Sequence, residues 1–324
     1  MKQIKITSLI IAAAFSLTSC LKEHPMNIDT SNGPKNQIEF ANSGSDVADF
    51  AKSTYPRYTA DLGKVLPGKS VNFNVNVGYS GVDVAPQDIT VNLALDQATL
   101  TQFNTENGTS FEIPSTDLYK FPTSIVIKKG EHIGQAQVTV TNTSNFDFNK
   151  NYALPLKITS ATTGAISGNY GKAVFSFSAR NQYDGVYTMN GTMTDVANSG
   201  LTGYYPADMQ LITFTGNSVA LWDPNVAKNY GHPILSGGSG SYYGSFTPVF
   251  YFDASGNVTK VENKFGQPSG NGRSARLDPT GVNKITFNAD GSIKQIQVKY
   301  IMDQVGVAVP RTFFDETFVY KGVR

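Results

Sequence analysis

A strict alternation of apolar and polar side chains is the feature of this sequence that most constrains its fold. Residues 71–77 read Val-Asn-Phe-Asn-Val-Asn-Val, and residues 89–95 alternate in a similar way. Successive side chains of a β-strand point to opposite faces, so a period of two residues predicts strands with one buried and one solvated face. A helix would scatter these apolar side chains around its surface. The pattern therefore predicts an all-β fold.

One short helix is expected among the strands of the N-terminal half. Asp96 is placed as an N-cap and Gly108 as a stop signal. Between them, Leu100 and Phe103 can share one helical face. Strands dominate on either side of this segment. Residues 36–180 have the length and strand content of an Ig-like β-sandwich, which is the fold predicted for this half.

A hairpin is predicted in the middle of this half. Residues 124–127 and 135–140 are strand-like, and Lys128-Lys129-Gly130 between them supplies the turn. Two further strands are expected at residues 152–158 and 173–179. We therefore expect the two strands that flank the lysine turn to be antiparallel neighbours in one sheet.

The C-terminal half consists of short strand-like segments joined by tight turns. The eight segments are 186–193, 210–215, 218–222, 247–252, 258–262, 284–287, 292–302 and 312–320. Gly216-Asn217, Ser255-Gly256-Asn257 and Asp290-Gly291 are favourable hairpin turns. Short sequential strands of this kind predict an antiparallel lipocalin-like β-barrel over residues 181–324. Residues 223–245 lack the pattern, contain several glycines, and predict one long loop.

The N-terminus has the pattern of an export signal. Lys2 and Lys5 precede an apolar run at residues 6–18, which is too short to span a bilayer. A positive start followed by a short apolar run is typical of a secretory signal peptide. We therefore expect residues 1–19 to be removed from the mature protein.

The end of this signal predicts a lipid anchor. Leu17-Thr18-Ser19-Cys20 resembles the bacterial lipobox, and Cys20 is the only cysteine of the chain. Lipid chains on Cys20 would hold the protein stably on a membrane. Residues 20–35 lack periodicity and contain Pro, Asn, Ser and Gly, so they predict a flexible lipidated tether.

The composition excludes several function classes. The chain carries 26 Lys and Arg against 25 Asp and Glu, so its net charge of +1 offers little attraction to nucleic-acid phosphates. A single cysteine excludes disulfide scaffolds and cysteine-rich zinc modules. His24, His132 and His232 stand far apart, and none lies in a His-Glu-x-x-His motif. No nucleic acid, metal or cofactor is therefore expected.

Two segments match the residue pattern of a binding motif but lack other features that the motif requires. Residues 63–70 fit the Walker A expression, whose chemistry needs a helix directly after it. The alternating residues 71–77 follow instead, so a turn between strands is predicted. Residues 147–151 begin like a calcium loop, but Tyr152 and Ile158 occupy the positions of its glycine and glutamate. A polar turn is expected there.

No catalytic constellation is recognisable in the sequence. The chain has no Gly-x-Ser-x-Gly elbow, and its only cysteine is assigned to lipid. Asp315 and Glu316 are adjacent, so on a strand they would point to opposite faces and make a poor acid–base pair. The sequence therefore predicts a protein without enzymatic activity.

Several motifs together resemble a family of Bacteroidota surface lipoproteins. In the N-terminal half they are Val91-x-Leu93-Ala94-Leu95-Asp96, Phe103-Asn104, Gly108-Thr109, Ile113-Pro114, Leu154-Pro155-Leu156-x-Ile158-Thr159 and Asn181-x-Tyr183-Asp184-Gly185-Val186-Tyr187. In the C-terminal half they are Leu277-Asp278-Pro279-Thr280-Gly281-Val282-Asn283-Lys284 and Phe314-Asp315-Glu316-Thr317-Phe318-x-Tyr320. The first set is similar to an Ig-like domain of unknown function. The second is similar to the lipocalin-like module that often follows it.

The resemblance implies a location and a role. Such lipoproteins are anchored in the outer membrane beside polysaccharide-utilisation importers, and several are thought to bind glycans. The same N-terminal domain precedes chitinase-like endoglycosidases, but their Asp-x-x-Asp-x-Asp-x-Glu motif has no match in this sequence. We expect a non-catalytic, surface-facing protein that binds a polysaccharide or oligosaccharide next to an outer-membrane importer. The alternative is an adhesin-like or structural envelope protein without a sugar site.

Aromatic and amide residues of the C-terminal half are the candidate glycan site. Sugars stack their C–H faces on aromatic rings, while amides and carboxylates order the hydroxyls. The candidates are Trp222, Asp223, Asn229, Tyr230, His232, Tyr242, Tyr243 and Arg273, with Tyr204, Tyr205 and Asn271 as further candidates in other loops. The alternative is that Trp222 and the tyrosines only cover the end of the barrel.

Overall fold

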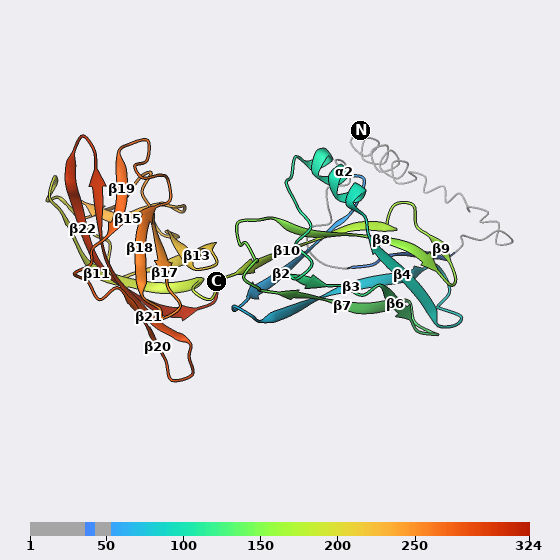
Figure 1. Ribbon diagram of the computed structural model, residues 1–324. Coiled ribbons are helices and arrows are strands. Elements are labelled where there is room, and N and C mark those ends of the chain that lie inside the picture. Colours follow the sequence, from blue (N-terminus) through green and yellow to red (C-terminus); the bar gives the residue numbers. More distant parts are fainter. Residues whose placement is uncertain (1–35, 43–52) are drawn as a thin grey trace, which may run out of the picture. The chain divides into compact units, whose positions relative to one another are not determined.

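The computed structural model describes residues 36–42 and 53–324 (Figure 1). The predicted signal peptide, Cys20 and the tether lie outside the described residues. The described part of the chain is almost entirely β-structure and contains one α-helix, so the predicted all-β fold is confirmed. No helix in this part is long and apolar enough to cross a membrane.

The N-terminal half is a sandwich of two five-stranded sheets. Its strands are β1 (Gln37–Phe40), β2 (Arg57–Lys64), β3 (Ser70–Ser80), β4 (Ile89–Leu95), β5 (Tyr119–Lys120), β6 (Ser124–Ile127), β7 (Ile133–Thr141), β8 (Tyr152–Ala161), β9 (Ala165–Ile166) and β10 (Lys172–Arg180). The first sheet has the order β5-β7-β3-β1-β9, and the second has the order β2-β10-β8-β4-β6. The pairs β1–β9 and β2–β10 are parallel, and the other described pairs are antiparallel.

The alternation in β3 buries one face of the first sheet. Val75 and Val77 point inward, are fully buried, and join one core with Phe175 of the second sheet. On the outer face, Asn72 Nδ2 donates to Gln137 Oε1 of β7 at 3.1 Å. The two-residue period thus separates an apolar face from a hydrated one, as strand geometry requires.

The predicted hairpin around Lys128-Lys129-Gly130 is wrong. β6 pairs with β4 in the second sheet, whereas β7 pairs with β3 and β5 in the first. Ile125 and Ile127 of β6, and Val138 and Val140 of β7, enter the same core from opposite sheets. A turn signal predicts that the chain reverses, but it does not determine whether the two strands share a sheet.

Helix α2 (Gln97–Asn107) occupies the predicted position. Leu100 and Phe103 are buried against β8 and β10 on the outer face of the second sheet (Figure 1). Gly108 ends the helix with a φ of 61°, a left-handed conformation that glycine adopts easily. Asp96 precedes the helix without a side-chain bond to a backbone N–H, and its Oδ2 instead accepts the hydroxyl of Thr99 at 2.9 Å and pairs with Lys172 Nζ at 2.8 Å.

The segments that resemble a Walker A motif and a calcium loop are both turns. Residues 65–69 connect β2 to β3, and Gly63 at the end of β2 and Gly68 in the connection have φ values of 65° and 71°. A strand follows this segment, as predicted from the alternation. In the other turn, Asp147 Oδ1 accepts the N–H of Asn149 at 2.9 Å. Among the residues that the structure describes, no group of three or more His, Cys, Asp or Glu could hold a metal ion.

The C-terminal half contains a nine-stranded antiparallel sheet that curls into a nearly closed barrel (Figure 1). Its strands are β11 (Gly185–Asp195), β13 (Ala207–Thr215), β14 (Ser218–Trp222), β17 (Pro248–Phe252), β18 (Val258–Asn263), β19 (Arg273–Leu277), β20 (Lys284–Phe287), β21 (Ile293–Gln304) and β22 (Ala308–Gly322). The order is β18-β17-β14-β13-β11-β22-β21-β19, and β20 pairs with β21. Every strand predicted for this half is present.

Side-chain amides bridge the two end strands of this sheet. Asn263 Nδ2 at the end of β18 donates to the carbonyl of Arg273 in β19 at 2.9 Å. The amide of Gln267 accepts the N–H of Ala275 at 2.7 Å and donates to its carbonyl at 2.5 Å. These amides take the place of a neighbouring strand, so the seam of the barrel has its backbone groups partly satisfied.

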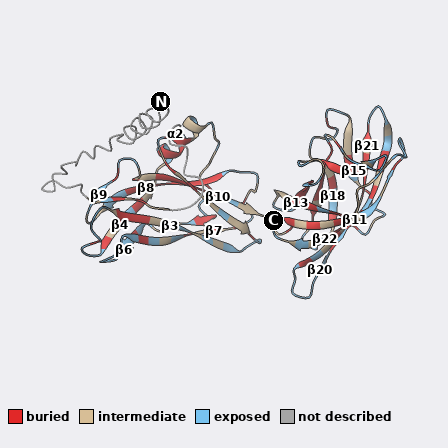
Figure 2. Ribbon diagram, turned by 180° about the vertical axis from the view of Figure 1, so that it is seen from behind, coloured by how far each residue is buried: buried red, intermediate tan, exposed pale blue. Residues whose placement is uncertain are grey.

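Aromatic side chains fill the interior of the barrel. Tyr187, Phe250, Tyr300, Phe314 and Phe318 are fully buried in one cluster. The rings of Tyr300 and Phe314 stack with their centroids 4.7 Å apart. Figure 2 shows buried residues along the barrel strands. Because side chains occupy the interior, ligand-binding groups are expected on the outer surface and at the rims of the barrel.

The long loop predicted at residues 223–245 is wrong, because this segment contains a hairpin. β15 (His232–Ser236) pairs with β16 (Ser239–Tyr243) and with β12 (Leu201–Gly203) in a separate three-stranded sheet. Gly237 and Gly238, at φ values of 57° and 84°, make the two-residue turn between β15 and β16. β16 reads Ser-Gly-Ser-Tyr-Tyr, which has no apolar alternation and therefore gives no strand signal.

Candidate functional site

The eight candidate residues divide by exposure. Asp223, His232 and Tyr243 are buried, Trp222, Tyr230 and Arg273 are half-buried, and Asn229 and Tyr242 are exposed. A buried residue that is bonded inside the protein can shape a site, but it does not touch a ligand in this conformation. The candidates therefore separate into a supporting group and a surface group.

Asp223 folds the segment that follows β14. Its carboxylate accepts the backbone N–H groups of Asn225 at 2.8 Å and Ala227 at 2.7 Å. Its backbone also exchanges two hydrogen bonds with Asn229, at 3.1 and 3.2 Å. With a side chain that is fully buried, Asp223 is a turn-forming residue that positions Asn229 and Tyr230.

His232 belongs to a buried network inside the barrel. Its Nδ1 lies 2.9 Å from the Pro233 carbonyl, so Nδ1 carries a proton, and Nε2 lies 2.8 Å from Glu316 Oε1. Glu316 also accepts the hydroxyls of Tyr205 at 2.5 Å and Tyr300 at 2.7 Å. Burial, and then the charge of Glu316, hold the pKa of both tyrosines well above 10. This network is internally satisfied and structural.

Tyr243 belongs to a second buried network at the end of the barrel. Its hydroxyl donates to Asp195 Oδ2 at 2.5 Å, and Arg311 Nε donates to the same oxygen at 2.9 Å. The guanidinium of Arg273 lies 5.1 Å from the centre of the Tyr243 ring. Burial raises the pKa of Tyr243. Tyr242 and Tyr243 are neighbours in β16, so their side chains point to opposite faces. Arg273 contacts the buried Tyr243 and therefore does not lie beside the exposed Tyr242.

Trp222 and Tyr230 form a pair on the outside of the barrel. Their rings meet edge to face with centroids 4.9 Å apart, and Trp222 is not a member of the buried core cluster. Trp222 stands opposite Gln210 in the β13–β14 ladder, so both side chains lie on the same, outer face. Lys264 Nζ lies 4.4 Å from the centre of the Tyr230 ring, which orients that ring by a cation–π contact.

Tyr242 extends this pair along the hairpin. Its side chain is 48% exposed and packs against Gly231, where an added Cβ would lie 3.1 Å from the Tyr242 ring. Gly231 follows Tyr230 directly, so Tyr242 packs against the chain next to the Trp222–Tyr230 pair. We call Trp222, Tyr230 and Tyr242 the aromatic surface. Asn229 is an exposed amide directly before Tyr230.

A shallow depression with a mixed polar and apolar lining lies next to the segment that Asp223 folds. It has a volume of about 330 Å³ and is lined by Thr188, Tyr204, Pro206, Ala207, Asp208 and Asn225. Asn225 belongs to the segment that Asp223 folds, and its Nδ2 donates to the Asp208 carbonyl at 2.9 Å. The further candidate Tyr204 therefore contributes to this depression, whereas Tyr205 points its hydroxyl at the buried Glu316.

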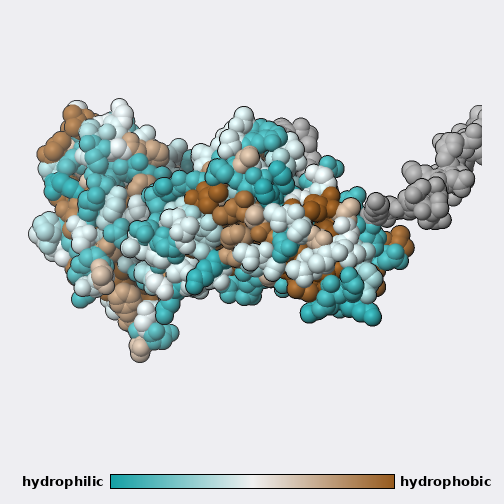
Figure 3. All heavy atoms as spheres, turned by 45° about the vertical axis from the view of Figure 1, so that its right-hand side comes forward, coloured by the Kyte–Doolittle hydropathy of each residue, from teal (hydrophilic) through white to brown (hydrophobic). Residues whose placement is uncertain are grey.

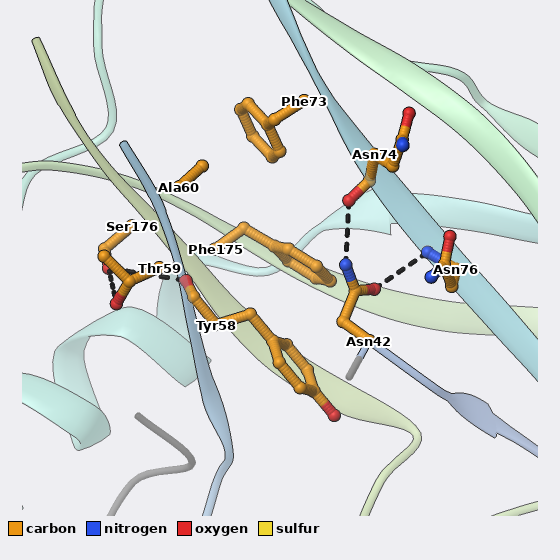
Figure 4. Close-up of a pocket in the computed structure, with 9 residues that line it drawn as sticks. All are labelled: Asn42, Tyr58, Thr59, Ala60, Phe73, Asn74, Asn76, Phe175 and Ser176. Atoms are coloured by element: carbon orange, nitrogen blue, oxygen red, sulfur yellow. Dashed lines mark hydrogen bonds between the residues drawn. The ribbon is translucent and has the colours of Figure 1, made fainter. Parts of the chain in front are cut away.

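A separate pocket lies in the sandwich (Figure 4). It has a volume of about 250 Å³ and is lined by Asn42, Tyr58, Thr59, Ala60, Phe73, Asn74, Asn76, Phe175 and Ser176. Sequence reasoning missed it, because Tyr58, Phe73 and Phe175 look like ordinary core positions of their strands. The alternation alone predicts that the asparagines of β3 only form its solvated face.

The polar groups around the sandwich pocket are largely bonded to one another. Asn42 Nδ2 donates to the Asn74 carbonyl and Asn42 Oδ1 accepts the Asn76 N–H, both at 2.8 Å (Figure 4). The hydroxyls of Thr59 and Ser176 lie 3.2 Å apart and bond to each other. The pocket therefore offers aromatic walls but few free groups to order sugar hydroxyls, and the aromatic surface is the better candidate.

Comparisons with known proteins support the architecture. A family model described as an N-terminal domain matches residues 35–165, which is less than half of the chain. No curated protein matches significantly. A crystal structure of a Bacteroides ovatus protein of unknown function is similar with a TM-score of 0.53 and 14% identity, over 89% of this chain and 95% of that chain. At this identity, the likeness shows a common fold.

Two more distant solved structures come from the same genus. One is a Bacteroides ovatus protein for which carbohydrate binding has been suggested, with 11% identity and a TM-score of 0.36 over 87% of this chain and 79% of that chain. The other is EndoBT-3987 of Bacteroides thetaiotamicron with a Man5GlcNAc product. It is 17% identical with a TM-score of 0.28, over 36% of this chain and 28% of that chain.

Proposed function

We propose that this protein is a non-catalytic, surface-exposed outer-membrane lipoprotein that binds glycan chains for a neighbouring importer. The observation that carries the proposal is the Trp222–Tyr230 pair, which stands outside the barrel core and remains partly open to solvent. Large half-exposed aromatic rings with nearby amides are the usual means of binding sugar rings in water. Cys20 supplies the anchor in this proposal.

The surroundings of the pair favour binding over hydrolysis. Glycoside hydrolysis needs two carboxyl groups that flank the scissile bond. The carboxylate closest in sequence to Trp222 is that of Asp223, and backbone N–H groups occupy it. Glu316 is 1% exposed and is held by three partners inside the barrel. Both acids are therefore engaged within the fold, and the exposed carboxylate of Asp208 in the nearby depression is paired with Lys321 Nζ at 2.6 Å.

A matched pair of tyrosine variants tests the proposed site. Tyr230 and Tyr251 both stand on the outside of the barrel under a lysine, with Lys264 and Lys260 respectively 4.4 and 4.0 Å from the ring centres. Only Tyr230 contacts Trp222. Calorimetry against a panel of neutral oligosaccharides should show binding that Tyr230→Ala weakens about tenfold or more and Tyr251→Ala leaves unchanged. Equal affinity in both variants and in the wild type would place the sugar elsewhere.

A further inference from the structure

The turn of the β21–β22 hairpin presents an unusual apolar surface. Residues 305–310 read Val-Gly-Val-Ala-Val-Pro, and Val305, Val307 and Val309 are 65%, 55% and 65% exposed. We call these three side chains the valine tip. Figure 1 shows the β21–β22 end of the C-terminal half, and Figure 3 shows apolar surface at the upper end of that half. Exposed apolar groups that cluster in this way indicate a contact surface.

Four hairpin turns of this half have a different composition. They are built from Gly216-Asn217, Gly237-Gly238, Asp253-Ala254-Ser255-Gly256-Asn257 and Asp290-Gly291. Single exposed valines also lie in two other connections, Val196 and Val282, whereas the tip carries three within five residues. The residues of the four hairpin turns are favoured there because of their backbone conformations and local hydrogen bonds. At the valine tip, only Gly306, with a φ of 84°, serves the backbone. Turn formation therefore does not explain the three valines.

A buried ion pair supports the valine tip from below. Arg311 follows the tip and is 8% exposed, and its Nε donates to Asp195 Oδ2 at 2.9 Å. Gln304 precedes the tip, and its Nε2 donates to the Asn271 carbonyl at 3.0 Å. Both ends of the turn are therefore fixed, so little conformational freedom would be lost when the tip binds a partner.

The backbone and charges of the tip suit an apolar medium. The N–H of Val305 donates to the Gly272 carbonyl at 2.9 Å, and the N–H of Val307 donates to the Gln304 carbonyl at 3.1 Å. Paired backbone groups can leave water without a large cost. The side chains of residues 305–310 carry no charge and no hydrogen-bonding group. Below the tip, Asp303 is paired with Arg276 and Asp195 with Arg311, both at 2.9 Å, and the Arg273 guanidinium bonds to Gln304 and the Gly244 carbonyl.

We propose that the valine tip inserts into the interfacial region of a lipid bilayer. Protein–protein hot spots are enriched in Trp, Tyr and Arg, and valine is under-represented in them, so the composition favours lipid over a protein partner. Three half-exposed valines give shallow, reversible insertion that adds to a covalent lipid anchor. Since residues 305–310 carry no charge, their insertion should depend little on salt. Insertion of the valine tip does not require glycan binding.

A fluorescent label reports the position of the tip directly. In the full chain with Cys20→Ser, Val307→Cys carries an environment-sensitive dye, and Val323→Cys, at a position 71% exposed in the same half, carries it in a matched control. With phosphatidylcholine vesicles, the label at residue 307 should shift to shorter wavelength and resist iodide, at low and high salt. The control label should do neither. Any membrane binding by the N-terminal apolar segment affects both labels alike.

An isosteric variant completes the test. Val305→Thr with Val309→Thr keeps the shape of the side chains and removes apolar surface, so it should reduce the partition of the tip label into vesicles by roughly tenfold. Its thermal unfolding should match that of the labelled parent, which excludes misfolding as the cause. Identical behaviour of the two labels with vesicles overturns the proposal. A wavelength shift without vesicles that grows with protein concentration also overturns it, and assigns the tip to contact with a second copy.

Discussion

At the scale of single residues, burial separates the polar groups that stabilise the fold from those that can meet a ligand. Glu316 is 1% exposed and has three hydrogen-bonding partners, whereas its neighbour Asp315 is exposed. The two acids therefore point to opposite faces, as their adjacency on a strand predicted. His232, which the sequence suggested as a sugar contact, is instead one of the partners of Glu316.

Removing the Glu316 carboxylate should destabilise the barrel strongly. Glu316→Ala leaves the hydroxyls of Tyr205 and Tyr300 and the His232 ring without their acceptor. Loss of one member of a buried charged network costs about 3–5 kcal/mol, to be measured by denaturant unfolding. Asp315→Ala is the matched control and should change stability by less than about 0.5 kcal/mol. Comparable effects of the two substitutions would contradict the network's assigned role.

Tyr58 should make the fold sensitive to alkali. Burial, with smaller effects from Tyr170 and Glu39, raises its pKa to about 12. In the unfolded chain tyrosine ionises near pH 10, so above that pH the unfolded state releases a proton that the folded state keeps. The stability due to neutral Tyr58 is complete below pH 10 and is lost as pH rises towards 12. Denaturant unfolding at pH 9 and 11.5 should show a smaller pH effect in Tyr58→Phe than in the wild type.

At the scale of elements, apolar periodicity predicted strands well and predicted their partners poorly. The apolar alternation in β3 and in the barrel segments between turns predicted the positions of these strands correctly, because each strand buries one of its two faces. β15 and β16 were missed, since Ser-Gly-Ser-Tyr-Tyr carries no apolar period. That error hid the pairing that buries Tyr243 and exposes Tyr242. The β6–β7 connection was misassigned because both strands supply apolar residues to one core from different sheets.

The glycine turn of the β15–β16 hairpin gives a test at this scale. Gly238 has a φ of 84° and no atom within 4 Å of an added Cβ, so Gly238→Ala imposes only backbone strain. We expect a loss of about 1 kcal/mol in stability. Gly270→Ala is the control, because that glycine also has open space around it but no left-handed φ. Equal stability of the two variants in thermal unfolding would contradict the assigned turn.

At the scale of the whole molecule, the described chain contains separate cores on either side of residue 180. The core of the sandwich comprises residues between Ile38 and Phe177, and the core of the barrel comprises residues between Tyr183 and Phe318. The two clusters share no residue. The predicted division into residues 36–180 and 181–324 follows this separation of apolar burial, and it remains a prediction about independent folding.

Separate expression tests the division. A fragment of residues 36–180 should unfold cooperatively by itself, because its core draws no residue from the other half. Circular dichroism during thermal unfolding should show a single transition for this fragment. A fragment without a transition, next to a cooperative full-length protein, would show that the halves fold only together.

Cys20 is predicted to carry the lipid anchor of the protein. Cys20 lies outside the described residues, and the expectation comes from the lipobox-like sequence alone. Cys20→Ala should prevent lipid attachment. The variant should lose its stable outer-membrane association in fractionation, and it should not incorporate a labelled fatty acid. Unchanged acyl labelling of the variant would remove the lipoprotein assignment.

Glycan binding at the aromatic surface is the central claim, and Trp222→Ala tests it most directly. The indole is half-buried on the outside of the barrel, so its loss should cost well below the roughly 3–5 kcal/mol of a core tryptophan. Binding of an oligosaccharide should weaken by about 1–3 kcal/mol, as for other rings that stack on aromatic side chains. Calorimetry together with thermal unfolding of the same preparation measures both quantities. A small loss of stability with a large loss of affinity is the predicted result, and full affinity combined with a core-sized loss of stability would contradict the account.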